Sequence, residues 1–331
     1  MLKANKNGWM KVLAQFALML SLFAPLLAQA YTGVTIVMSA PTATNLEFIG
    51  QFKAELASKN SLLRVKVIDL QAQEKSGETQ LVVAENSELV IALGVKALEA
   101  ASKLKRNTPV LGVFTPLPAF NSLMAVSGRE LGNFSAIVLD QPYARQLSLI
   151  KIMLPEARNI GVLLGPSSGQ FSEDLKEEAD ERALNLLQEK VNQQADLLPK
   201  LNKLLQTSDA LIAIPDAKIY SRETAQPILL TSYRHKKTVF GYSQSYVRAG
   251  ALAAVYSSSK QIVKQAAEIV IASQLAPSIL PPPQAPKYFS VAVNYQVARS
   301  LDITLQDEDV IYKKLQDAEL IEVAEHDAIK N

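Results

Sequence analysis

Short apolar runs alternate with amphipathic stretches along most of the chain. The runs are almost continuously apolar, which is typical of parallel strands covered by helices on both faces. Their spacing of roughly 20–30 residues fits strand–helix–strand units. The predicted strands are Val34–Met38, Leu63–Ile68, Leu89–Leu93, Val110–Phe114, Ala136–Leu139, Ile160–Leu164, Ala210–Ile214, Thr238–Tyr242, Ala251–Val255 and Phe289–Val293.

The stretches between these runs have helical periodicity. Apolar residues recur at every fourth position from Phe171 to Leu187, with Ser172 as the expected N-cap. The segments Asn45–Ser58 and Ser259–Leu275 show a similar pattern. The alternation of strands and helices predicts a doubly wound α/β fold.

Ten strands are more than one sheet usually holds, so the pattern favours two smaller parallel sheets, each in its own lobe. Three segments interrupt the pattern as crossings between lobes would: Ser127–Ser135, Ser243–Gly250 and Pro277–Pro286. Two lobes joined in this way predict a hinge and an interlobe cleft at the carboxyl ends of the strands. The predicted domains are lobe 1 at residues 31–135 and 250–283, lobe 2 at 136–249 and 284–304, and a tail at 305–331.

The first thirty residues have the pattern of an export signal. Three lysines come before or at the start of an apolar run, Val12–Leu27, which contains no acidic residue, and Ala28-Gln29-Ala30 follows it. This is the order of a signal peptide, and it predicts cleavage after Ala30 and a periplasmic protein. An uncleaved membrane anchor is the alternative, but the run is shorter than the roughly 20 residues of a membrane-spanning helix.

Charge and composition exclude several classes of function. Without the three lysines of the signal, 31 basic residues face 32 acidic ones, so no nucleic acid or anionic membrane is expected as a partner. The chain has no cysteine and two histidines, which excludes disulfides, thiolate catalysis and a His-rich metal site. P-loop, dinucleotide-binding and metalloprotease motifs are absent from the sequence, and we expect no cofactor. The tail carries eight acidic and three basic residues with a partial apolar stripe, which predicts a solvated helix on lobe 2 or a docking element.

One segment, Gly165-Pro166-Ser167-Ser168-Gly169, fits the G-x-S-x-G pattern between a strand and a helix. Asp216 and His235 follow in the order of a serine hydrolase. However, the HGGG-type oxyanion loop is absent, and His235 lies in a cationic run. We therefore favour a binding role, in which hydroxyl and free N–H groups at a helix start bind an anionic ligand group.

The other candidate residues follow the ends of predicted strands. Asp216 is expected to pair with a cationic ligand group or to cap the next helix, and Phe114 to stack on the ligand or to pack in the core. Gly94 suits a tight turn, while Ser243 and Tyr246 lie in the second predicted crossing. The candidate ligand-binding residues are Ser39, Gly94, Phe114, Thr115, Ser167, Ser168, Asp216, Ser243 and Tyr246.

Several segments match a known family in order and spacing. They are Thr108–Phe114, Gln146–Leu163, Asp209–Asp216, Tyr246–Ala254, Gln265–Ala267 and Val293–Leu301. In these segments the chain resembles the periplasmic substrate-binding components of ABC transporters, in the branch that includes tryptophan-binding proteins.

The resemblance implies a type I periplasmic binding fold that closes around a small, amino-acid-like ligand, with no catalytic activity. It also implies an inner-membrane ABC permease as partner, and we expect a monomer. Cleft motifs of the family are altered at Leu117-Pro118, Asn133–Ala136 and Gly165-Pro166. Two hypotheses with this fold therefore stay open: a receptor of an ABC importer, and a periplasmic sensor or interaction module. A serine hydrolase at Gly165–Gly169 is a third, less favoured alternative.

Overall fold

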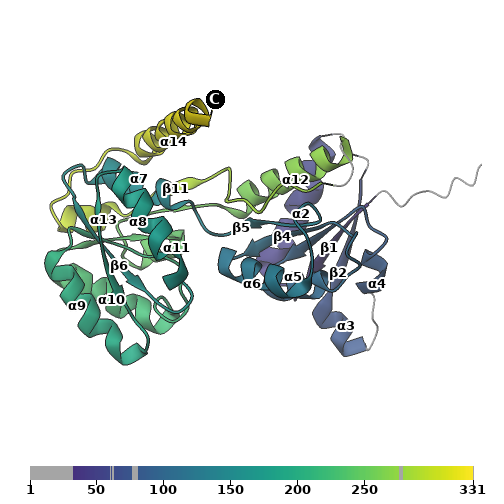
Figure 1. Ribbon diagram of the computed structural model, residues 1–331, viewed down its shortest axis with the longest axis horizontal. Helices are drawn as coiled ribbons and strands as arrows, with labels where there is room; N and C mark the ends of the chain where they lie inside the picture. The colour runs from purple at the N-terminus through teal and green to yellow at the C-terminus, as the bar shows by residue number, and fades with distance from the viewer. Residues whose placement is uncertain (1–32, 60, 62, 77–80, 276–278, 331) are drawn as a thin grey trace, which may run out of the picture.

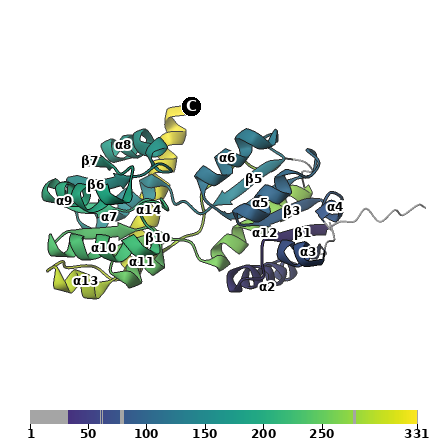
Figure 2. The same ribbon diagram turned by 90° about the horizontal axis from the view of Figure 1, so that it is seen from below.

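Two separate β-sheets organise the chain, as the computed structural model shows. A five-stranded sheet has the order β2-β1-β3-β4-β5, and a six-stranded sheet has the order β11-β10-β9-β8-β6-β7. Each sheet forms the centre of one lobe, and narrow segments join the two lobes (Figures 1 and 2). The structure describes residues 33–59, 61, 63–76, 81–275 and 279–330. The predicted signal peptide lies outside the described residues.

Lobe 1 contains the first half of the chain and one helix from the second half. Its strands are β1 (Gly33–Met38), β2 (Arg64–Asp69), β3 (Leu89–Leu93), β4 (Val110–Thr115) and β5 (Phe134–Val138). Its helices are α2 (Ala43–Ser58), α3 (Leu70–Ser76), α4 (Leu81–Ala84), α5 (Val95–Ser102), α6 (Leu117–Ser127) and α12 (Ser259–Leu275).

Lobe 2 contains most of the second half. Its strands are β6 (Asn159–Leu164), β7 (Asn185–Lys190), β8 (Ala210–Ile212), β9 (Thr238–Gly241), β10 (Ala253–Tyr256) and β11 (Ser290–Val293). Its helices are α7 (Tyr143–Met153), α8 (Ser172–Glu181), α9 (Leu197–Thr207), α10 (Arg222–Arg234), α11 (Gln244–Ala249), α13 (Tyr295–Ser300) and α14 (Glu308–Lys330), with short 3-10 helices η1 (Gly169–Phe171) and η2 (Gln194–Asp196).

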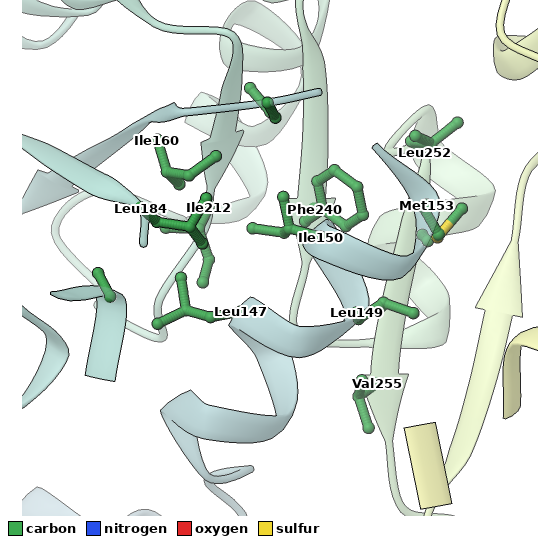
Figure 3. Packing of buried hydrophobic residues seen from close by; sticks show 14 of the residues in the cluster. Leu147, Leu149, Ile150, Met153, Ile160, Leu184, Ile212, Phe240, Leu252 and Val255 are labelled. Atoms are coloured by element: carbon green, nitrogen blue, oxygen red, sulfur yellow. The ribbon is translucent and has the colours of Figure 1, made fainter. Parts of the chain in front are cut away.

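The apolar runs form buried strands because both faces of each sheet are covered. On β3, Leu89 and Ile91 pack in one core cluster, while Val90 packs in the cluster on the other face. On lobe 2, α7 lays Leu147 and Ile150 against the sheet, as Figure 3 shows. Each such side chain contributes about 1.5–3 kcal/mol through its burial. The expected α/β class with two parallel-dominated sheets is confirmed.

Three local predictions were wrong. The strand β7 was not expected, because it lies at the edge of its sheet and is only half-buried. The helix predicted from Phe171 to Leu187 ends at Glu181, and Leu187 lies on β7 instead. Ala183 has a φ of 52° at the turn between them. Ser172 does not cap α8: its hydroxyl donates to Gln188 Oε1 at 2.6 Å.

The crossings between the lobes also differ from the prediction. The run beginning at Ala136 pairs with β4 in lobe 1, and the run Ala251–Val255 contributes to β10 in lobe 2. The segment Ser243–Gly250 holds α11 within lobe 2. The sheet pairing thus moves two strands across the boundaries drawn from composition. Because β10 leaves lobe 2 at the edge where the chain later returns, β11 runs antiparallel to it.

The acidic tail is mostly one helix, α14, that packs on lobe 2. Ile311 and Leu315 are fully buried in the lobe 2 core, and Leu320 is exposed. Glu319 and Glu322 pair with Arg145 on α7 and Arg182 at the end of α8. The prediction of a helix on lobe 2 is confirmed in the described part of the tail.

Asp209 precedes β8, and its side chain is hydrogen-bonded to the backbone at the start of β6. This carboxylate should make the stability of lobe 2 depend on pH. Its Oδ2 accepts hydrogen bonds from the N–H groups of Arg158 at 2.9 Å and Asn159 at 2.8 Å. Burial alone would raise the pKa of Asp209, but these two N–H groups and the charge of Lys237 hold it below the usual value. A depressed pKa adds stability above the unfolded pKa of about 3.9, and this stability is lost as the pH falls through the folded pKa.

We therefore expect Asp209→Asn to lower the melting temperature at neutral pH and to have a smaller effect at about pH 3. Thermal unfolding of both proteins at the two pH values measures this. Glu177→Gln, which changes an exposed carboxylate on α8, is the control. A difference between Asp209→Asn and the parent that does not shrink on acidification would contradict the prediction.

Candidate functional site

Phe114 lies at the carboxyl end of β4 in a strained backbone conformation. Its φ of 56° lies in the left-handed region, and the pairing of β4 with β5 shifts register between Val113 and Thr115. Its half-buried ring meets the Phe48 ring edge-on at 5.4 Å between centroids. A non-glycine residue in this region costs about 1–3 kcal/mol and is found preferentially at binding sites. Phe114 is therefore the candidate of lobe 1 with the most distinctive geometry.

The other lobe 1 candidates are less distinctive. Thr115 is fully buried, with its hydroxyl 3.4 Å from the Val113 carbonyl oxygen. Gly94 has a φ of 83° and donates its N–H to that same carbonyl at 2.8 Å, as a tight turn before α5 requires. Ser39 lines a cavity of about 470 Å³ with Lys96 and other residues, and neither Gly94 nor Phe114 belongs to this lining. The structure does not bring the lobe 1 candidates into one cavity.

On lobe 2, Asp216 holds the loop after β6 rather than an open position. Its carboxylate is 4% exposed. Its Oδ2 accepts hydrogen bonds from the Ser167 N–H at 3.0 Å and from the Ser168 N–H and hydroxyl, each at 2.9 Å. Its Oδ1 accepts one from the Lys218 N–H at 2.9 Å. The protein's own carboxylate therefore occupies the anion-binding position predicted at Gly165–Gly169.

This arrangement changes the roles predicted for three residues. The N–H groups of Ser167 and Ser168, expected to be free for a ligand, are used by Asp216. The hydroxyl of Ser168 also accepts from the Gly165 N–H at 2.9 Å. Ser167 is exposed and keeps its hydroxyl at the surface, whereas Ser168 and Asp216 act as a structural clamp.

The hydrolase arrangement is not assembled. His235 ends α10, and its Nε2 lies 2.9 Å from Asn202 Oδ1 on α9. Helix α10 runs from the carboxyl edge of the sheet back to its amino edge, where β9 begins. His235 and Ser167 are therefore at opposite edges of lobe 2, and no proton transfer between them is possible.

Three tyrosines gather at the carboxyl edge of lobe 2. Tyr220 follows β8, Tyr242 follows β9 and Tyr246 lies on α11. The ring centroids of Tyr220 lie 6.0 Å from Tyr242 and 5.9 Å from Tyr246, and those of Tyr242 and Tyr246 lie 5.5 Å apart. Gly241 makes room for this cluster, because a Cβ there would lie 2.9 Å from the Tyr246 ring.

Two hydroxyls of this cluster lack partners. Tyr220 is 7% exposed and Tyr246 5% exposed, and neither hydroxyl oxygen has a hydrogen-bond partner among the described residues. Burial raises the pKa of both, and the neighbouring tyrosines add to the shift, so both stay neutral hydroxyls. A buried polar group without a partner costs about 1–3 kcal/mol. In this arrangement the two hydroxyls are therefore unsatisfied polar groups beneath the carboxyl edge of lobe 2, and neither oxygen is exposed at the surface.

Ser243 plays the structural role of a cap. It precedes α11, and its Oγ accepts from the Tyr246 N–H at 3.2 Å. It thus fixes the position of the Tyr246 backbone and contributes to the cluster indirectly. The sequence pattern indicated Tyr246 but not Tyr220 or Tyr242. The available signal was that Tyr242 ends the predicted strand Thr238–Tyr242 and that Tyr220 lies in the segment after the predicted strand Ala210–Ile214.

A further polar group lies where the chain first crosses to lobe 2. Asp140 Oδ2 accepts from the Leu117 N–H at 2.6 Å, and burial raises the pKa of Asp140. Tyr143 begins α7 with its ring 6.3 Å from that of Phe171. Burial and the carboxylates of Asp140 and Asp174 raise the Tyr143 pKa. The described residues contain no group of three or more His, Cys, Asp or Glu side chains that could hold a metal ion.

Comparison with known families decides what kind of protein carries this site. The family profile described as ABC transporter substrate binding protein matches residues 65–315, which is more than half of the chain. The chain belongs to the ABC transporter substrate-binding protein family. Substrate-binding proteins of this family bind small molecules outside the cytoplasm and typically work with an ABC permease. None of the curated proteins matches the sequence.

Solved structures show the same fold. An ABC domain in complex with L-Trp from Streptococcus pneumonia is 17% identical, with a TM-score of 0.57, and the match covers 86% of this chain and 98% of that one. A ligand-free, open substrate-binding protein with adhesive properties from Clostridium difficile is 16% identical, with a TM-score of 0.66 and coverages of 83% and 96%. A conserved domain protein from Vibrio cholerae is 20% identical, with a TM-score of 0.57 and coverages of 86% and 98%.

This substrate-binding protein therefore has the type I periplasmic binding protein fold that the sequence predicted. Within the part of the chain that is described, no helix is both long and apolar enough to span a membrane. In such a fold the carboxyl ends of the strands are the expected place for a ligand. Phe114 on lobe 1 and the tyrosine cluster on lobe 2 both occupy that place.

Proposed function

We propose that this substrate-binding protein is the solute receptor of an ABC importer. It works in the periplasm after cleavage behind Ala30, and it delivers a small ligand to an inner-membrane permease. The ligand binds between the carboxyl edges of the two sheets, and the lobes close around it. Closure is a population shift, driven by contacts that the ligand makes to both lobes only in the closed state.

The tyrosine cluster at the carboxyl edge of lobe 2, in which the hydroxyls of Tyr220 and Tyr246 have no partner, supports this proposal. Both oxygens are buried in the described arrangement, so the proposal includes a shift of these side chains when the ligand binds. Each costs stability in the free protein, and a ligand that pairs with them returns that free energy as affinity. The ring of Phe114 offers an apolar contact from the other lobe. Aromatic rings and neutral hydroxyls fit a ligand with a flat apolar part and a polar group, and the related Streptococcus protein is described in complex with L-Trp.

A thermal-shift screen of the exported protein with amino acids, short peptides, nucleosides and sugars tests the proposal. We expect a ligand of the aromatic amino-acid class to raise the melting temperature. Removal of one hydroxyl by Tyr220→Phe or Tyr246→Phe should weaken its binding about tenfold, the equivalent of about 1.4 kcal/mol. Tyr233→Phe, an exposed tyrosine on α10, is the matched control and should leave the affinity unchanged.

Phe114→Gly separates a binding role from a packing role. Glycine removes the strain of the left-handed backbone, about 1–3 kcal/mol. The substitution also removes the half-buried ring, whose burial contributes a similar free energy. We therefore expect a melting temperature close to that of the parent and a large loss of affinity. A ligand that binds Phe114→Gly as tightly as the parent would show that Phe114 is only a packing residue.

A periplasmic sensor or interaction module is the second candidate. The altered motifs at Leu117-Pro118 and Asn133–Ala136 favour it, because the family pattern is lost at positions expected near the ligand. Ligand uptake by cells with and without this protein separates the two functions. A ligand that binds the pure protein but enters both strains at equal rates would support the sensor.

A further inference from the structure

Side-chain hydrogen bonds tie the three crossing segments together. The crossings are Leu139–Pro142, Ser257–Ser258 and Pro281–Phe289. Gln141 Nε2 on the first crossing donates to Ser257 Oγ on the second at 2.9 Å. The Ser257 hydroxyl donates in turn to the Tyr288 carbonyl on the third at 2.6 Å. These two hydrogen bonds connect all three segments about which one lobe can rotate against the other.

Arg145 on α7 joins this chain of bonds to the C-terminal helix. Its side chain is 6% exposed. Its Nη1 donates to Gln141 Oε1 at 2.6 Å and to the Pro286 carbonyl at 3.0 Å, and its guanidinium lies 4.1 Å from the centroid of the Phe289 ring. Its Nε donates to Glu319 Oε1 on α14 at 2.6 Å. One buried cation thus contacts the first crossing, the third crossing and α14.

Helix α14 is positioned to control Arg145. Ile311 and Leu315 anchor it in the lobe 2 core, and the Tyr312 ring meets the Phe289 ring at 5.3 Å between centroids. In both Figures 1 and 2 the helix, drawn in yellow, belongs to lobe 2. Glu319, 28% exposed, supplies the carboxylate that balances the buried guanidinium. Removing the partner of a buried cation leaves an uncompensated charge, and this penalty falls on the arrangement in which the cation is buried.

We propose that α14 restrains the hinge, that is, the three crossing segments. Glu319 on α14 acts through Arg145, the positioning residue, and so sets the equilibrium between two arrangements of the lobes. With the ion pair intact, Arg145 holds Gln141 and Pro286 together and favours the arrangement described here. Without it, the crossings are released and a second arrangement is populated. This inference goes beyond the proposed function, and its test requires no ligand.

Distances between spin labels measure the equilibrium directly. The chain has no cysteine, so Lys53→Cys on α2 and Gln206→Cys on α9 provide two unique, exposed label sites, one on each lobe. The labelled protein is purified after export, as the cell processes it. In Glu319→Gln we expect the distance distribution to broaden, with a second population raised about fivefold or more, the range of a typical coupling.

Asp317→Asn is the matched control, because it removes one exposed carboxylate from the same helix two residues away. It should leave the distribution as in the parent. Ser257→Ala is an independent variant. It removes the hydroxyl that links the three crossings by hydrogen bonds, and it changes no charge. It should broaden the distribution in the same way as Glu319→Gln.

A purely structural role for Glu319 would lower the melting temperature without changing the distances in the folded protein. That result, or equal broadening in Asp317→Asn, would overturn the proposal. Unchanged distributions in both Glu319→Gln and Ser257→Ala would overturn it as well. A failed ligand screen would weaken the proposed function alone, because the distances are measured on the protein without ligand.

Discussion

Replacing Asp216 by alanine is expected to lower the free energy of unfolding by about 3 kcal/mol. The change leaves three buried or half-buried N–H groups and the Ser168 hydroxyl without their acceptor. Hydrogen bonds to a charged group contribute about 1.5–3 kcal/mol each, and buried donors left unpaired add to the loss. Urea unfolding measures the change. Asp196→Ala, whose carboxylate makes no capping bond at the start of α9, is the control and should stay within about 0.5 kcal/mol.

The same carboxylate explains why residue 165 is glycine. A Cβ on Gly165 would lie 2.7 Å from Asp216 Oδ2 and 2.8 Å from its Cγ. Gly165→Ala alone should therefore cost about 1–3 kcal/mol through overpacking. In the Asp216→Ala background the space is open, so the double variant should be more stable than the sum of the two single effects predicts, by about 1 kcal/mol or more. Strict additivity would show that the two residues do not interact.

Arg129→Met is the second large change, with an expected loss of about 3 kcal/mol. The Arg129 guanidinium is buried and donates to the carbonyl oxygens of Leu104, Lys105, Thr108 and Asn133. Burial lowers the pKa of Arg129, and the four carbonyls stabilise its charge in place of a carboxylate. Methionine fills part of the space but leaves these acceptors unpaired, which is among the recognised causes of large destabilisation.

Arg106→Met is the control for this variant. Arg106 lies in the loop whose carbonyl oxygens Arg129 contacts, but its side chain is exposed. Its replacement should therefore change the free energy of unfolding by about 0.5 kcal/mol or less. Urea unfolding of the two variants against the parent is the measurement. Equal stability of Arg129→Met and the parent would mean that water replaces the guanidinium, and that the loop 104–108 does not depend on it.

The clamp around Asp216 also changes how a binding experiment is interpreted. From the sequence, a carboxylate after a buried strand was predicted either to contact the ligand or to cap the next helix, and neither role was favoured. Because the carboxylate already accepts four hydrogen bonds, loss of ligand binding in Asp216→Ala would follow from disorder of the Gly165–Gly169 loop as readily as from a lost contact. Tyr220→Phe and Tyr246→Phe remove one oxygen atom each, and they test the site without disturbing that loop.

The sequence was a good guide where burial alone decides the structure. Nearly continuous apolar runs such as Val34–Met38 and Ile160–Leu164 have few alternatives to a strand covered on both faces. Of the eleven strands in the described residues, ten were located in this way. The strand β7 was missed because this edge strand is only half-buried. It contains only two apolar residues, Leu186 and Leu187, and Leu187 continues the apolar spacing of the preceding helix.

The crossings could not be located from composition. Clusters of glycine and proline mark turns in a sequence. Leu139–Pro142 is short and contains one proline and no glycine, and Ser257–Ser258 contains neither. What makes them crossings is the choice of partner on each side: Phe134–Val138 pairs with β4, and Ala253–Tyr256 pairs with β9 and β11. Pairing between strands distant in sequence is a property of the folded chain, and no local pattern encodes it.

By itself, the sequence determined the class of this protein: two α/β lobes, a family of substrate-binding proteins and the edge at which a ligand is expected. Periodic burial is enough for the α/β class, because it depends on residues close to one another along the chain, and the resemblance of several segments indicated the family. Only the tertiary structure decided the chemistry of the edge. It turned Asp216 inward to hold the Ser167–Ser168 loop, and it assembled Tyr220, Tyr242 and Tyr246 from separate elements. The reason is physical: whether a polar group is free for a ligand depends on which distant groups already satisfy it.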